Sequence, residues 1–160
     1  NEIFDKSHFS DTVTDRAEYE LCSFNNCTFT CLAGSRFIDC VFESCNLSVC
    51  NIAGTSLQGV HFKSCKMPGL RIDTCDTFGL SVHFHHCQLD NSVFYDRKLS
   101  KTKFHHLSGA IFDNTNLEKA DLSTARSFSI DPTRNKLKKA RFSLPYVIGL
   151  LDTFQIHIDT

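Results

Sequence analysis

The segment CVFESCNLSVCNIAG, residues 40–54, repeats a pattern every five residues. Cys40, Cys45 and Cys50 each precede a large apolar residue by two positions. Neither the 3.6-residue period of an amphipathic helix nor the two-residue alternation of a strand gives this spacing. The segment therefore predicts a repeat architecture in which short extended segments alternate with corners.

The same period runs from Phe4 to Leu122, interrupted by three shifts of frame. The position two residues before each large residue is mostly small or apolar, and it holds eight of the nine cysteines. Because alternate residues of an extended segment point the same way, both positions are expected to face the interior. Six of the seven glycines follow a large residue by two positions, where a corner needs permissive dihedral angles.

Grouping the units by four places like residues above one another. The steps between equivalent residues are then 18 to 22 residues, and the two clearest columns are Phe4, Phe24, Phe42, Phe62, Phe84, Phe104 and Cys27, Cys45, Cys65, Cys87. We infer a coil of about twenty residues with four sides, in which successive turns are about 4.8 Å apart.

The units CSFNN, CVFES, CNLSV, TSLQG, TNLEK and ADLST resemble those of the pentapeptide-repeat family, over roughly residues 2 to 129. The resemblance implies an all-β fold, a right-handed quadrilateral β-helix of about six coils. The early units depart from the family pattern because they use cysteine where alanine is usual. Arg97 also departs, since it falls on an inward small-residue position before Leu99, where we expect a bulge or a corner.

The period stops after Ser127, which divides the chain into a β-helix over residues 1–129 and a C-terminal segment over residues 130–160. Ser143 is expected to cap a short helix that has Pro145 in its first turn, and Gln155–Asp159 alternates like a strand. Such a helix would cover the open end of the β-helix with its apolar residues, Val147, Ile148, Leu150, Leu151 and Phe154. The segment is similar to the C-terminal segments of the quinolone-resistance and microcin-immunity branch, which implies a homodimer.

The cysteines have four possible roles. A uniform five-residue spacing would place successive thiols on different sides of a coil, which disfavours zinc, and the odd count disfavours disulfides, although stacked cysteines are close enough to bond. Only Cys31 lies off the inward position and could be an exposed, reactive thiol. We therefore interpret the other cysteines as small apolar residues that fill the core.

Histidines cluster at His85, His86, His105 and His106. If Phe84 and Phe104 are one coil apart, His85 lies over His105 and His86 over His106. This patch could hold zinc, nickel or copper, or change its charge near pH 6, whereas the simpler interpretation is a set of solvated side chains beside a corner.

No combination of nucleophile, base and oxyanion donor and no phosphate-binding loop occurs, so we expect neither an enzyme nor a cofactor. The net charge of −1 argues against direct binding of nucleic acid or an anionic membrane, and no apolar run could span a bilayer, so we expect a cytoplasmic protein. The resemblance implies a non-catalytic protein that mimics DNA and binds DNA gyrase or topoisomerase IV; the alternative is a scaffold for another protein. The candidate acidic surface is Asp5, Asp11, Asp15, Glu18, Glu20, Asp39 and Glu43.

Overall fold

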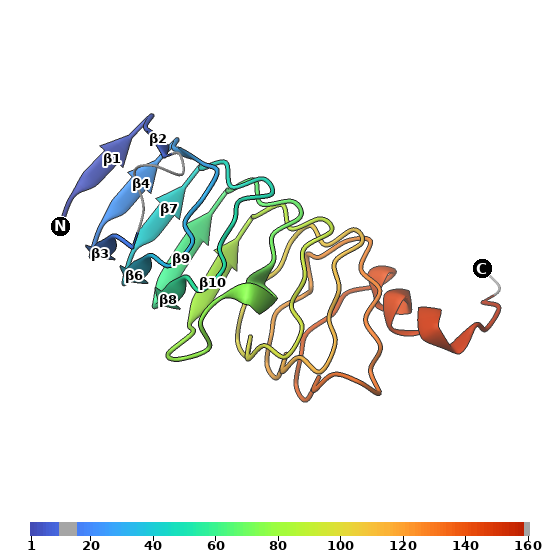
Figure 1. The fold of residues 1–160 in the computed structure, drawn as a ribbon. Helices are drawn as coiled ribbons and strands as arrows, with labels where there is room; N and C mark the ends of the chain where they lie inside the picture. The colour runs from blue at the N-terminus through green and yellow to red at the C-terminus, as the bar shows by residue number, and fades with distance from the viewer. Residues whose placement is uncertain (10–15, 159–160) are drawn as a thin grey trace.

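The computed structural model describes residues 1–9 and 16–158 and shows an all-β solenoid (Figure 1), which confirms the predicted fold class. The strands are β1 (Ile3–Asp5), β2 (His8–Phe9), β3 (Glu18–Glu20), β4 (Ser23–Asn25), β5 (Thr28–Phe29), β6 (Arg36–Ile38), β7 (Val41–Glu43), β8 (Ser56–Gln58), β9 (Val60–Lys63) and β10 (Val82–His85). Three 3-10 helices complete the structure: η1 (Ile72–Thr74), η2 (Tyr146–Leu150) and η3 (Asp152–Phe154).

All strand pairs are parallel, and each strand pairs with the strand one turn further along the chain. The largest sheet has the order β1-β4-β7-β9-β10, and the smaller sheets are β2-β5 and β3-β6-β8. Regular strand pairing in the largest sheet covers only the turns up to β10. Beyond it, isolated bridges such as Lys103↔Asp121 and Asp121↔Arg141 join successive turns. The predicted count of about six coils is therefore not supported by the strand pairing.

The corners of the solenoid need the left-handed backbone conformation. The six glycines that the sequence places at corners all have positive φ, between 64° and 72°, which confirms that prediction. Non-glycine residues take this conformation at other corners, for example Asp39 with φ 50° and Lys119 with φ 60°. At Gly59 an added Cβ atom would collide with the carboxylate of Asp39 in the preceding turn, so the Asp39 side chain would have to move, and the positive φ also favours glycine.

The C-terminal segment differs from the prediction. The expected capping helix is not supported, because η2 and η3 are short 3-10 helices of five and three residues. Pro145, not Ser143, occupies the N-cap of η2, without a side-chain hydrogen bond. Gln155–Ile158 form no strand. Gly149 packs against Phe128, and the Ile130 N–H donates to the Gly149 carbonyl (3.0 Å), so this backbone still lies over the last turns.

Residues beyond the predicted boundary also join the solenoid, since Asn116 bridges to Lys136 and Asp121 to Arg141. Within the described residues, no helix has the length and apolar character needed to cross a lipid bilayer.

Candidate functional surface

The interior of the solenoid is filled by stacked aromatic rings. Phe42 is fully buried, with ring centroids 4.7 Å from Phe24 and 4.9 Å from Phe62. The column continues through Phe84 to Phe104 and begins at Phe4, which is only half-buried because it lies at the end of the stack. Rings at these distances fill the interior along this column.

The stacked thiols also belong to the interior. Cys45, Cys65 and Cys87 are buried, and their Sγ atoms donate to the carbonyls of phenylalanines one turn earlier, at 3.2 to 3.4 Å. Hydrogen bonding with the Cys45 thiol, together with burial, raises the pKa of Cys65, and burial raises the pKa of Cys75 to about 12. All nine cysteines are present as thiols. Hydrogen bonding with the Cys65 thiol lowers the pKa of Cys45 and of Cys87. Cys65 and Cys75 are therefore poor nucleophiles and poor metal ligands, because both roles require the thiolate.

Cys31, the cysteine that lies off the inward position, is half-buried on the wall of the solenoid and bridges to Asn51 in the next turn.

Arg97 lies inside the wall. Its side chain is buried, and its guanidinium donates to the backbone carbonyls of Ile72 (3.1 Å), Asp73 and Asp96 (3.3 Å). These bonds connect the turn that contains Arg97 to η1 in the turn before. The residue that departs from the repeat pattern thus holds an irregular segment in place, because its charged guanidinium donates to carbonyls of that segment.

A short segment projects from the wall between Asp76 and Ser81. The Asp76 N–H donates to the Thr55 carbonyl and the Ser81 N–H to the Leu57 carbonyl, so the residues between them have no ladder partner in the previous turn. Phe78 lies in this projection and is 79% exposed. Sequence reasoning missed this feature, although the step of 22 residues between Phe62 and Phe84 was a signal of two additional residues.

The histidines do not stack as predicted. His86 lies beside His105, with ring centroids 4.4 Å apart. His106 forms a backbone bridge with Gln88, and the ring of His85 lies 5.8 Å from that of His61. The reason is that one turn spans 18 residues at this corner, from Gln88 to His106, whereas it spans 20 residues from Phe84 to Phe104.

A depression of about 160 Å³ lies beside this cluster and is lined by His85, His86, Lys103, His105, Asp121 and Thr124. Burial is the main cause that lowers the pKa of His85 and of His105, and neighbouring cationic groups lower it further. Among the residues that the structure describes, no three His, Cys, Asp or Glu side chains are placed to share a metal ion.

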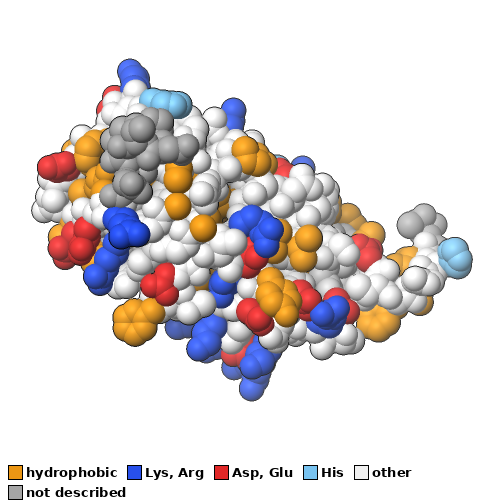
Figure 2. All heavy atoms as spheres, viewed as in Figure 1, with side chains coloured by type: hydrophobic (Ala, Val, Ile, Leu, Met, Phe, Trp, Pro, Cys, Tyr) orange, Lys and Arg blue, Asp and Glu red, His pale blue; other side chains and the backbone are white. Residues whose placement is uncertain are grey.

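The candidate acidic residues that the structure describes are exposed but do not form one row. Asp5 and Glu43 end strands β1 and β7, while Glu18, Glu20 and Asp39 lie on the neighbouring face and its corner. Asp11 and Asp15 lie outside the described residues. Figure 2 shows both signs of charge on one face of the molecule, with Lys and Arg side chains gathered along its lower margin.

The tail divides its apolar residues between the solenoid and the solvent. Val147 and Leu150 are half-buried, and Leu150 packs against the core together with Tyr146. The exposed residues include Ile148 (49%), Leu151 (38%) and Phe154 (49%).

Comparisons with known proteins give the same architecture. The family model for pentapeptide repeats matches in eight copies, over residues 30–69 and 105–126. No curated protein sequence matches the chain. Among solved structures, two trypsin-treated variants of QnrB1, described as a plasmid-mediated fluoroquinolone resistance protein, have a TM-score of 0.56 with 17% and 18% sequence identity. Each alignment covers 98% of this chain and 97% of the QnrB1 chain, and at this identity it concerns the fold alone. With their five-residue period and stacked parallel turns, the matched residues of this chain, 30–69 and 105–126, are pentapeptide repeats.

Proposed function

We propose that the protein is a non-catalytic binding module that acts through the outer surface of its solenoid. The observation that carries this proposal is the filled interior, in which Phe24, Phe42 and Phe62 stack without a gap. A protein with this interior can present side chains in regular rows along a rigid wall, which suits recognition of another macromolecule.

The partner that we propose first is a type II topoisomerase, DNA gyrase or topoisomerase IV, bound as a mimic of DNA. Support comes from exposed carboxylates on the first turns, including Asp5, Glu18 and Glu43, because a negative surface on a narrow rod could enter a DNA-binding channel. The likeness in fold to QnrB1, a fluoroquinolone resistance protein, is a further reason to test these enzymes. The protein would bind the enzyme and not the nucleic acid.

The test is a gyrase supercoiling assay with purified protein, with and without a fluoroquinolone. We expect inhibition or protection at micromolar protein, weakened in the variant Asp5→Asn/Glu18→Gln/Glu43→Gln. The matched control is Glu118→Gln/Asp152→Asn, which neutralises carboxylates on the later turns. An unchanged reaction at micromolar protein would rule out the topoisomerase proposal.

The second candidate is a scaffold for a different protein. The mixed charge of the outer surface favours it, since Arg36 lies beside Glu18 on the first turns, and Lys98 and Lys136 lie in line on the later ones. A partner with both signs of charge would fit this wall better than a DNA-binding channel does. Crosslinking in cell extract followed by mass spectrometry distinguishes the two candidates, because only the first predicts a topoisomerase subunit.

We further propose that two copies associate through the tail. Exposed apolar side chains at Ile148, Leu151 and Phe154 lie on neighbouring 3-10 turns, and such a patch is stabilised when a second copy covers it. Light scattering should give a dimer for the native chain and a monomer for Leu151→Asp/Phe154→Asp. Val49→Asp, at an exposed apolar residue elsewhere, is the control. A monomeric native chain would contradict this proposal.

A further inference from the structure

One corner of the solenoid forms a continuous ridge. It recurs in successive turns, and we call it the corner column: residues 20–21, 38–39, 58–59, 78–79, 100–101, 118–119 and 138–139. The Leu21 N–H donates to the Ile38 carbonyl (2.9 Å) and the Asp39 N–H to the Gln58 carbonyl (2.8 Å). The later corners are joined in the same way, since the Lys119 N–H donates to the Lys138 carbonyl (3.0 Å). Hydrogen bonds of this kind thus join the corners on both sides of residues 78–79, and Gly79 itself lies against the side chain of Gln58 in the corner before it.

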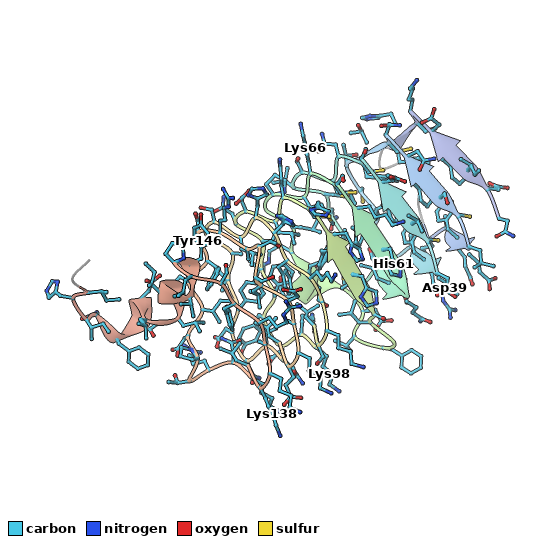
Figure 3. The ribbon with its side chains drawn as sticks, turned by 180° about the vertical axis from the view of Figure 1, so that it is seen from behind. Asp39, His61, Lys66, Lys98, Lys138 and Tyr146 are labelled. Carbon is cyan, nitrogen blue, oxygen red and sulfur yellow. The ribbon has the colours of Figure 1, made fainter. Side chains whose placement is uncertain are left out.

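The charge of the corner column changes sign along its length. Its first two corners carry the exposed carboxylates of Glu20 and Asp39. Its last three corners carry the exposed ammonium groups of Lys101, Lys119, Lys138 and Lys139, with Glu118 the one carboxylate among them. Figure 3 shows that the labelled residues Asp39 and Lys138 lie on the same long edge of the solenoid. One partner of uniform charge would be attracted by one half of this ridge and repelled by the other.

The middle of the corner column is apolar and held in shape. Phe78, 79% exposed, has three corners before it and three after it. The Phe78 N–H donates to the Asp76 carboxylate (3.0 Å), and Gly79, with φ 68°, lies against the side chain of Gln58. A projecting aromatic ring on a braced turn costs little conformational entropy when it is buried in an interface.

We propose that the corner column binds a second copy of this chain in an antiparallel, two-fold arrangement, with the symmetry axis at Phe78. Successive turns of parallel strands are about 4.8 Å apart, so residues an equal number of corners from Phe78 should meet across the axis. Glu20 then faces Lys138, Asp39 faces Lys119, and the two Phe78 rings meet. Each charge contact occurs twice, as an isologous interface requires, and the uncharged Phe78 corner lies where the axis passes, with Lys101 facing the uncharged corner at Gln58 and Gly59.

This contact is distinct from the one proposed for the tail. A ridge is narrow, so the interface is small and belongs to the weak, reversible class. Its attraction comes from exposed charges, which salt screens over about 10 Å at 0.1 M. We therefore expect association at tens of micromolar protein in low salt and its loss near about 0.5 M salt, whereas apolar contacts in the tail persist in high salt.

Two charge-reversed variants test the pairing. The acid-reversed variant is Glu20→Lys/Asp39→Lys, and the base-reversed variant is Lys119→Asp/Lys138→Glu. Each new residue type already occurs in this column, where Lys119 and Asp39 both adopt positive φ, so the folds should be unaffected. The matched control reverses Glu43 and Lys66, which are exposed away from the corner column.

Sedimentation velocity of the full chain in low salt gives the result. We expect each reversed variant alone to associate at least tenfold more weakly than the native chain, because like charges then meet at both ends. A 1:1 mixture of the two variants should recover association as a heterodimer, and Phe78→Ala should weaken the native chain and the mixture alike. Three results would overturn the proposal. The first is equal, salt-independent association of all variants, and the second is a mixture that behaves as the average of its components. The third is a native chain that does not associate.

Discussion

Replacing Arg97 by methionine tests whether the buried guanidinium stabilises the irregular turn at η1. The side chain donates to three backbone carbonyls, two of them in the previous turn. Hydrogen bonds from a charged donor contribute about 1.5–3 kcal/mol each, but the variant avoids the cost of desolvating the guanidinium. We therefore expect Arg97→Met to lower the free energy of unfolding by about 2–4 kcal/mol.

The assay is urea unfolding followed by far-UV circular dichroism. With a slope of about 2 kcal/mol per molar urea, the midpoint should fall by about 1–2 M. Arg71→Met is the matched control. Arg71 also bonds to Asp73 of η1, through the Asp73 carboxylate, but the Arg71 side chain is 59% exposed. We expect no measurable shift for it, because exposed ion pairs are screened. Equal midpoints for the native chain and Arg97→Met would refute the reasoning.

Three further predictions concern the imidazoles, the core and the thiols. Burial and neighbouring imidazoles lower the pKa of His83 and of His105, so the folded state protonates less readily than the unfolded chain. The melting temperature should therefore be highest above about pH 6.5 and fall below that pH, because the unfolded chain then binds protons first. The fall should be smaller for His83→Gln/His105→Gln, and identical pH profiles would contradict this. Phe42→Ala should cost about 3–5 kcal/mol in urea unfolding, whereas Phe78→Ala should change the midpoint little, because that ring is already exposed. Burial raises the pKa of the Cys75 thiol to about 12, so this thiol should react with a disulfide reagent at pH 8 only after denaturation. A fast reaction of Cys75 in the native protein would count against this burial.

Much of the fold follows from local spacing in the sequence. The five-residue period identified the inward residues because side-chain direction in a short extended segment depends only on the nearest neighbours. The same holds for the corner glycines, all six of which have positive φ. The phenylalanine column was visible for a related reason, since the steps between Phe4, Phe24 and Phe42 are close to one full turn.

Contacts between turns were decided by the tertiary structure. Insertions and shortened turns, which accumulate over about twenty residues, set three features of the wall. These are the pairing of His106 with Gln88, the hydrogen bonds of Arg97 to the turn before, and the projection of Phe78. The tail forms two short 3-10 helices that place Tyr146 and Leu150 against the core, a contact that helix propensity alone does not encode. The sequence by itself thus determined which side chains face inward, since that is a local property. Only the tertiary structure decided which outward side chains stand in line, including the sign change along the corner column, because alignment across turns depends on the exact length of every turn between them.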